Sequence, residues 1–185
     1  MAQTEKNTAK TETKVGTRAH TVKTSLKKVK INTDTADEFW HSGSYVNTSS
    51  VIIEKTNKAE WQMTPVEKMQ LVKDGLSKTD LEKLKNKTNL DYDKLSTLLS
   101  TARATLINKK GTAHFSAALS EKIVSIADVY SYGFEVFEDE TKFNEWVFKP
   151  NQALGGKQPF ELLDNQFGRE EVKNLIGRID YGVYS

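Results

Sequence analysis

The chain contains no cysteine, and its three histidines, His20, His41 and His114, are scattered along it. A thiolate nucleophile, a disulfide framework and a zinc ribbon are therefore excluded, and little is left for a metal site of any kind. No stretch approaches the roughly 18 consecutive apolar residues of a membrane span. The N-terminus also lacks the apolar stretch of a signal peptide. We therefore expect a soluble, cytoplasmic protein that binds no metal and does not enter a membrane.

The recognisable motifs of enzymes are also missing. There is no Gly-rich phosphate loop of the GxGxxG or Walker type, no Ser-His-Asp set beyond chance, and no carboxylate pair that spacing singles out. The 185 residues are enough for one ordinary domain or two small ones. We expect no enzymatic activity and no cofactor.

Aromatic residues are absent from the first 38 residues, where threonine and lysine recur in a low-complexity pattern. Such a segment cannot bury enough apolar surface to offset its chain entropy. We predict a disordered basic arm over residues 1–38 and an irregular linker segment over residues 39–63. Within the linker, Val51, Ile52 and Ile53 indicate a brief strand or an extended segment that packs on the next elements of the chain.

Charge is distributed unevenly. Basic residues outnumber acidic ones by eight to three in residues 1–35 and by twelve to ten in residues 36–111, but acidic residues prevail by twelve to seven in residues 112–185. A basic front end suits a polyanion such as DNA, whereas an acidic back end suits a basic protein surface. Simple solvation of both ends is the alternative.

Helical signals cover the rest of the chain and predict an all-α fold. Thr64, Pro65 and Glu67 form a capping box that starts a helix over about 65–74, which Gly75 ends. Apolar residues from Leu119 to Phe137 recur at helical spacing and predict the longest helix. Shorter helices are expected before Pro150, after Pro159 and up to Asp180. We predict a small helix-turn-helix bundle over residues 64–111, followed by a second helical domain over residues 112–185.

The helix-turn-helix prediction rests on three short helices. Two of them are expected over about 78–87 and 91–99, and Ser100 and Thr101 then cap a third. In such motifs the start of the recognition helix meets base edges, while basic residues contact phosphates. A purely structural bundle with a solvated basic end is the alternative. The candidate DNA-binding residues are on the third helix: Arg103, Thr105, Lys109 and Lys110.

From Phe134 onward the sequence resembles the toxin-binding domain of Xre/MbcA/ParS-type antitoxins, the partners of RES-domain toxins. The resemblance covers about residues 77–185 and is looser in the helix-turn-helix, where Ala104 and Ile107 stand at positions that are often Arg in the family. Ser120, Glu121 and Lys122 occupy the place where the family usually carries an acidic-basic pair near a Ser. The matching positions are Glu135-Val136-Phe137, Trp146, Pro150-Asn151, Ala153-Leu154-Gly155-Gly156, Pro159, Leu162-Leu163-Asp164, Gly168, Val172, Leu175-Ile176-Gly177-Arg178-Ile179 and Tyr181-Gly182-Val183-Tyr184-Ser185.

The end of the chain is unusual because it carries two tyrosines, whereas a fraying terminus is ordinarily polar. Tyrosine combines apolar area with a hydroxyl and is well suited to entering a cleft. Packing of these rings back onto the last helix is the alternative. The candidate toxin-binding residues are Arg178, Asp180, Tyr181, Gly182, Val183, Tyr184 and Ser185.

The resemblance implies an antitoxin that binds and blocks the active site of a RES-domain toxin that consumes NAD, and that represses its own operon through DNA binding. Its expected partners are the cognate toxin, operator DNA and a second copy of itself, with a larger hetero-oligomer forming around the toxin. A dimeric helix-turn-helix transcription regulator without a toxin partner is the alternative function.

Overall fold

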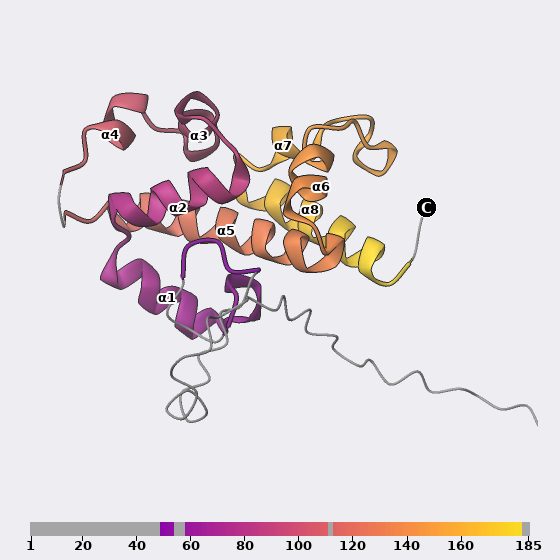
Figure 1. Cartoon of the computed structure of the whole chain (residues 1–185), viewed down its shortest axis with the longest axis horizontal. Coiled ribbons are helices and arrows are strands. Elements are labelled where there is room, and N and C mark those ends of the chain that lie inside the picture. Colours follow the sequence, from indigo (N-terminus) through magenta and orange to yellow (C-terminus); the bar gives the residue numbers. More distant parts are fainter. Residues whose placement is uncertain (1–48, 54–57, 111–112, 183–185) are drawn as a thin grey trace, which may run out of the picture. The chain divides into compact units, whose positions relative to one another are not determined.

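A computed structural model describes residues 49–53, 58–110 and 113–182 of the chain (Figure 1). The predicted arm over residues 1–38 lies outside these residues, as do the candidate toxin-binding residues Val183, Tyr184 and Ser185. The described residues form helices and no strand, which confirms the all-α prediction. None of the described helices is both long and apolar enough to cross a membrane.

The elements follow one another with short connections. In chain order they are the 3-10 helix η2 (Glu60–Gln62), α1 (Pro65–Asp74), α2 (Lys78–Thr88), α3 (Tyr92–Leu99), α4 (Arg103–Ile107), α5 (Ala117–Phe137), α6 (Glu140–Trp146), the 3-10 helix η3 (Gln152–Leu154), α7 (Pro159–Leu162) and α8 (Gln166–Asp180) (Figure 1).

Helix α1 starts and ends where local signals predict. The Thr64 hydroxyl accepts a hydrogen bond from the Glu67 amide, and the Glu67 carboxylate accepts one from the Thr64 amide at 2.6 Å. Pro65 occupies the first helical position, where its missing N–H costs nothing. Gly75 ends the helix with a φ of 75°. The predicted capping box and stop are confirmed.

Helix α5 is the central element. It packs against η2, α1, α2 and α3 as well as against α6 and α8, and Figure 1 shows α8 running alongside it. Its residues Ile123, Ile126 and Tyr130 are completely buried. One hydrophobic core extends from Val51 to Ile176, so residues of the helix-turn-helix segment and of the C-terminal segment are buried together.

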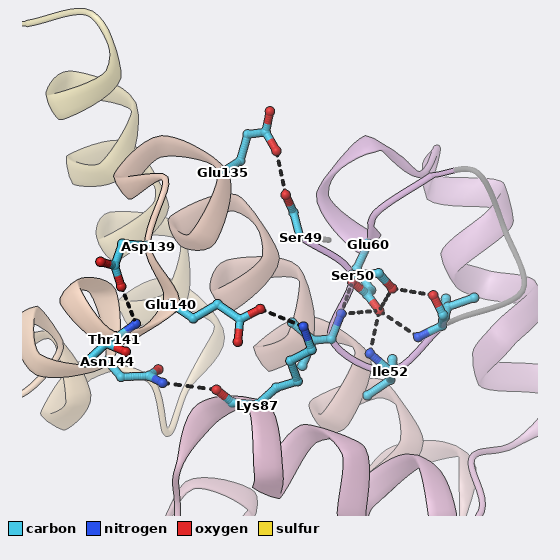
Figure 2. Close-up of polar contacts among 12 residues, drawn as sticks. Ser49, Ser50, Ile52, Glu60, Lys87, Glu135, Asp139, Glu140, Thr141 and Asn144 are labelled. Atoms are coloured by element: carbon cyan, nitrogen blue, oxygen red, sulfur yellow. Dashed lines mark hydrogen bonds and ion pairs between the residues drawn. The ribbon is translucent and has the colours of Figure 1, made fainter. Parts of the chain in front are cut away.

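The described start of the chain packs into this core without forming a strand with any described residue. Val51 and Ile52 are buried, and their amides, with that of Ile53, donate to the carboxylate of Glu60 at 2.7–3.1 Å (Figure 2). The Ser50 hydroxyl donates to the same group at 3.1 Å. These bonds offset the cost of burying a charge. Glu60 therefore anchors residues 50–53, a role that the sequence did not indicate.

Candidate functional sites

Helix α4, the candidate recognition helix, is separated from α3 by three residues. Ser100 ends α3 in the left-handed conformation, with a φ of 48°, and Ala102 precedes α4 without a side-chain cap. The prediction that Ser100 and Thr101 cap this helix is therefore wrong, because Ser100 is used as the C-terminal stop of the preceding helix.

Lysines from neighbouring helices stabilise the C-terminal ends of α3 and α4. The Lys122 ammonium donates to the carbonyl of Leu99 at 3.1 Å, and that of Lys78 donates to the carbonyl of Ile107 at 2.6 Å. A cation at this end also complements the helix dipole. Lys122, which the sequence singled out by resemblance, thus links α5 to the end of α3.

The candidate DNA-binding residues lie on and after α4. Arg103 and Thr105 are exposed on the helix, where Leu106 is the one buried residue. Lys109 and Lys110 lie beyond it, so the prediction that they belong to this helix is wrong. The helix ends at Ile107 because Asn108 and Gly111 are poor helix formers and Lys78 occupies its last carbonyl. The Lys109 ammonium lies 5.4 Å from the centroid of the Phe115 ring.

Arg103 forms an ion pair with Asp93 of α3. Its Nη1 atom lies 3.0 Å from Oδ1 and 3.3 Å from Oδ2 of that carboxylate. Both side chains are more than half exposed, at 57% and 69%. Exposed pairs of this kind contribute at most about 1 kcal/mol. A phosphate or a base edge can therefore displace Asp93 from the Arg103 guanidinium at small cost.

A cleft of about 770 Å³ lies between the C-terminal end of α2 and helix α6. Lys87 pairs with Glu140 across it at 2.6 Å, and the side-chain Nδ2 of Asn144 donates to the Lys87 backbone carbonyl at 3.0 Å (Figure 2). Lys149, on the same cleft, lies 3.4 Å from the carboxylate of Glu145. Because these lysine charges are already balanced by carboxylates, we assign no anionic ligand to the cleft.

The start of α8, in the candidate toxin-binding region, is fixed by its neighbours. Gly168 packs so closely on α7 that a Cβ atom would overlap the carbonyl of Leu162. Arg169 is buried, and it donates from Nε to the Ser125 hydroxyl at 2.8 Å and from Nη1 to the Leu163 carbonyl at 3.0 Å. Burial lowers the pKa of its guanidinium from the ordinary value. These contacts hold α8 against both α5 and α7.

A two-sided ion pair adds to this attachment. The carboxylate of Asp128, on α5, lies 2.6 Å from the ammonium of Lys68, on α1, and 2.7 Å from that of Lys173, on α8. The side chain of Asp128 is only 12% exposed, so these pairs are less screened than those on the surface. Asp128 therefore links α8 to α1 through the central helix.

The candidate residues at the end of α8 surround its last turn. The Tyr132 hydroxyl donates to Asp180 at 3.4 Å, and Arg178 lies 3.3 Å from Glu171. Burial first, and then the nearby charge of Asp180, raise the pKa of the Tyr132 hydroxyl, which stays protonated as a donor. Tyr181 is 72% exposed. Arg178, Asp180 and Tyr181 are thus brought together at one end of the helix.

Two aromatic residues of this region were not singled out from the sequence. The Trp61 ring packs on the Tyr132 ring at a tilt of 35°, with ring centroids 5.3 Å apart. The Trp61 backbone amide donates to the Ser131 hydroxyl at 2.9 Å, which places η2 beside α5. Phe167, in the first turn of α8, is 81% exposed. The sequence did carry a signal for the exposure of Phe167: this residue does not fall on the apolar face of the last helix, which starts at Val172.

The C-terminal region is similar to a known family of antitoxin domains. Residues 133–182 match the family described as the antitoxin Xre/MbcA/ParS C-terminal toxin-binding domain. The chain is 34% identical over 76 residues to the antitoxin Xre of Photorhabdus laumondii, which covers 40% of this chain and 51% of that protein. For the antitoxin Xre of Yersinia enterocolitica the identity is 35% over 72 residues, covering 38% and 49%.

A third relative is similar over a longer stretch. The Prs ADP-ribosylating antitoxin of a Sphingobium species is 24% identical over 139 residues, which cover 69% of this chain and 87% of that protein. By contrast, the chain spans about half the length of the two Xre antitoxins that it matches.

Proposed function

The chain belongs to the Xre/MbcA/ParS antitoxin family, and we propose that it binds and blocks the active site of a RES-domain toxin that consumes NAD. One observation carries this proposal: Tyr181 stands exposed at the end of a helix that buried contacts hold rigidly, within the stretch that matches a toxin-binding domain. A rigid support lowers the entropy cost of inserting an aromatic ring into a cleft. The tail that begins at Arg178 is then the inhibitory element.

Charge supports the same partner. Acidic residues prevail by twelve to seven in residues 112–185, and such an excess attracts a basic surface of the kind that binds the phosphates of NAD. The name of the Sphingobium relative, Prs ADP-ribosylating antitoxin, is compatible with a partner of this chemistry, because ADP-ribose is transferred from NAD.

We further propose that the complex represses its own operon through α4. Arg103 and Thr105 are exposed at the start of this helix, where recognition helices meet base edges. Lys109 and Lys110 follow the helix, and in this proposal they contact phosphates rather than bases. A homodimer would present two such helices to a palindromic operator, as the symmetry of such sites requires.

Removing residues 181–185 tests the inhibitory role of the tail. The truncated chain is co-expressed with the product of the adjacent gene, and growth and cellular NAD are followed. We expect growth arrest and NAD loss to return, because the truncation removes the residues proposed to enter the active site. The truncated chain should still fold, since it keeps Asp180 and its bond from Tyr132 and leaves the packing of α8 intact. The helical circular dichroism of the truncated chain is the control for folding. Full neutralisation by the truncated protein would place inhibition in the helical body instead.

The alternative function, a transcription regulator without a toxin partner, is supported by the exposure of α4. The full-length chain separates the two proposals. A regulator of this kind would bind the promoter of its own gene, as measured by a mobility shift, and would leave growth arrest by the adjacent gene product unchanged.

A further inference from the structure

The outward face of α8 carries an unusual stripe of side chains. Phe167 is 81% exposed and Tyr181 is 72% exposed, although large aromatic side chains are ordinarily buried. At 3.6 residues per turn, the positions between them that share the same side of the helix are polar and solvent-accessible. From its start to its end the stripe consists of Phe167, Glu170, Glu171, Asn174, Arg178 and Tyr181.

Phe167 is held in this exposed position by the packing of the residues beside it. The side chain of Asn165 caps the helix by accepting from the Gly168 amide at 2.9 Å. Gly168 lies against α7, and the next residue, Arg169, is buried between α5 and α7. The helix cannot rotate to hide the Phe167 ring without breaking these contacts. A ring that is already fixed loses little freedom when it enters a partner.

The side chains of the stripe indicate what kind of surface it can bind. Its two aromatic ends are about 21 Å apart at 1.5 Å per residue. Between them lie Glu170 and Glu171, against the single positive charge of Arg178, which is paired with Glu171. Such a face fits a protein surface with an apolar pocket at each end and basic residues between. It does not fit DNA, whose phosphates the glutamates would repel.

We infer that this stripe of α8 binds the cognate toxin, with Phe167 as an anchor about 21 Å from Tyr181. This inference rests on the proposed function, in which the tail alone reaches the active site. The toxin is the occupant that the observations favour, because the stripe continues into the proposed inhibitory tail, which begins at Arg178 and includes Tyr181. In addition, residues 133–182, which match a toxin-binding domain, include both aromatic ends of the stripe. Phe167 then supplies affinity, and the tail supplies inhibition.

The test compares Phe167→Ala with Met69→Ala in the full-length chain. Met69 is a suitable control because it is a large apolar side chain, 57% exposed, on a different helix, α1. Binding to the purified product of the adjacent gene is measured by calorimetry. We expect Phe167→Ala to raise the dissociation constant at least about tenfold, as loss of an aromatic anchor does, and Met69→Ala to leave it unchanged. Thermal melting should be the same for both variants and the parent, since neither side chain is buried.

A second measurement separates the two roles on the same helix. At concentrations high enough to saturate the toxin, Phe167→Ala should still inhibit NAD consumption completely, whereas the chain lacking residues 181–185 should bind and fail to inhibit.

Parent-like affinity of Phe167→Ala would overturn the inference and leave the proposed function standing. A change in self-association with unchanged toxin binding would also overturn it and make the stripe an interface between two copies. If the parent chain itself does not bind the toxin, the proposed function fails and this inference fails with it.

Discussion

Helices α4 and α8, the two elements proposed to meet partners, are built in opposite ways. Helix α4 has five residues, no side-chain cap and one buried residue, Leu106. Helix α8 has 15 residues, a cap from Asn165 and five buried residues, among them Gly168 and Arg169. The sequence of α8 is therefore constrained by packing, whereas that of α4 is almost free of it.

This difference changes how the family resemblance is interpreted. The positions of α8 that resemble the family at Gly168, Val172 and Ile176 are buried, so they report the fold rather than the partner. Phe167, by contrast, is exposed, so packing does not constrain it. On α4, Ala104 and Ile107 are exposed, so their departure from the family pattern does not alter the core.

The largest expected effect tests the close packing of α8. Gly168→Ala should lower the free energy of unfolding by about 3 kcal/mol, since its methyl group would overlap the Leu162 carbonyl, which belongs to the backbone and cannot move aside cheaply. Ala104→Leu, on the exposed face of α4, should change it by less than about 0.5 kcal/mol. Urea denaturation followed by circular dichroism measures both. Equal stability of the two variants would remove the contrast between the helices.

The next prediction compares the stability cost of removing an arginine from each helix. Arg169→Ala should cost about 2 kcal/mol of stability, because it removes two hydrogen bonds of a buried charged group and leaves the Leu163 carbonyl without that donor. Arg103→Ala removes only an exposed pair and should cost less than about 0.5 kcal/mol. The same denaturation experiment applies. A cost for Arg103→Ala as large as that for Arg169→Ala would show that α4 is held by its surface charges.

The third prediction concerns the affinity of α4 variants for DNA. Although Arg103→Ala has little effect on folding, it should cost about 1 to 3 kcal/mol of binding energy at one base position, while Lys110→Ala should weaken all operator variants alike. A mobility-shift titration with single-base operator variants distinguishes the two patterns. If Arg103→Ala binds every variant as the parent does, Arg103 does not read a base.

The smallest effect concerns a cap that depends on pH. The hydrogen bond from Lys58, followed by those from Thr64, lowers the pKa of Glu67 from 4.5 to about 2. Because the pKa in the folded state is the lower one, the stability contributed by Glu67 is present above about pH 4.5 and is lost as the pH falls toward 2. The difference in melting temperature between the parent and Glu67→Gln should therefore shrink over that range. A constant difference would mean that Glu67 does not act through its charge.

The bounds of a helix were predicted correctly where they depend on residues close together in the chain. The capping box of Thr64 and Glu67 and the stop at Gly75 involve neighbours in the chain, so they were readable directly. The long helix was predicted from Leu119 to Phe137 and is observed over Ala117–Phe137, because its apolar periodicity is sustained over five turns. The end of α4 was wrong because the Lys78 ammonium that binds its last carbonyl comes from a residue 29 positions away.

Residues close together in the chain therefore made most of the helices, the capping box of α1 and the charge of each region predictable, whereas the start and the end of α4 were not. Which large side chains stay exposed became visible only from the packing of the helices. Phe167 is fixed outward because Gly168 and Arg169 pack inward against α5 and α7. Residues 50–53 are in place because the Glu60 carboxylate accepts from the Ser50 hydroxyl and from the amides of residues 51–53. The residues in these contacts are between six and 44 positions apart, and the helical periodicity of the sequence does not encode them.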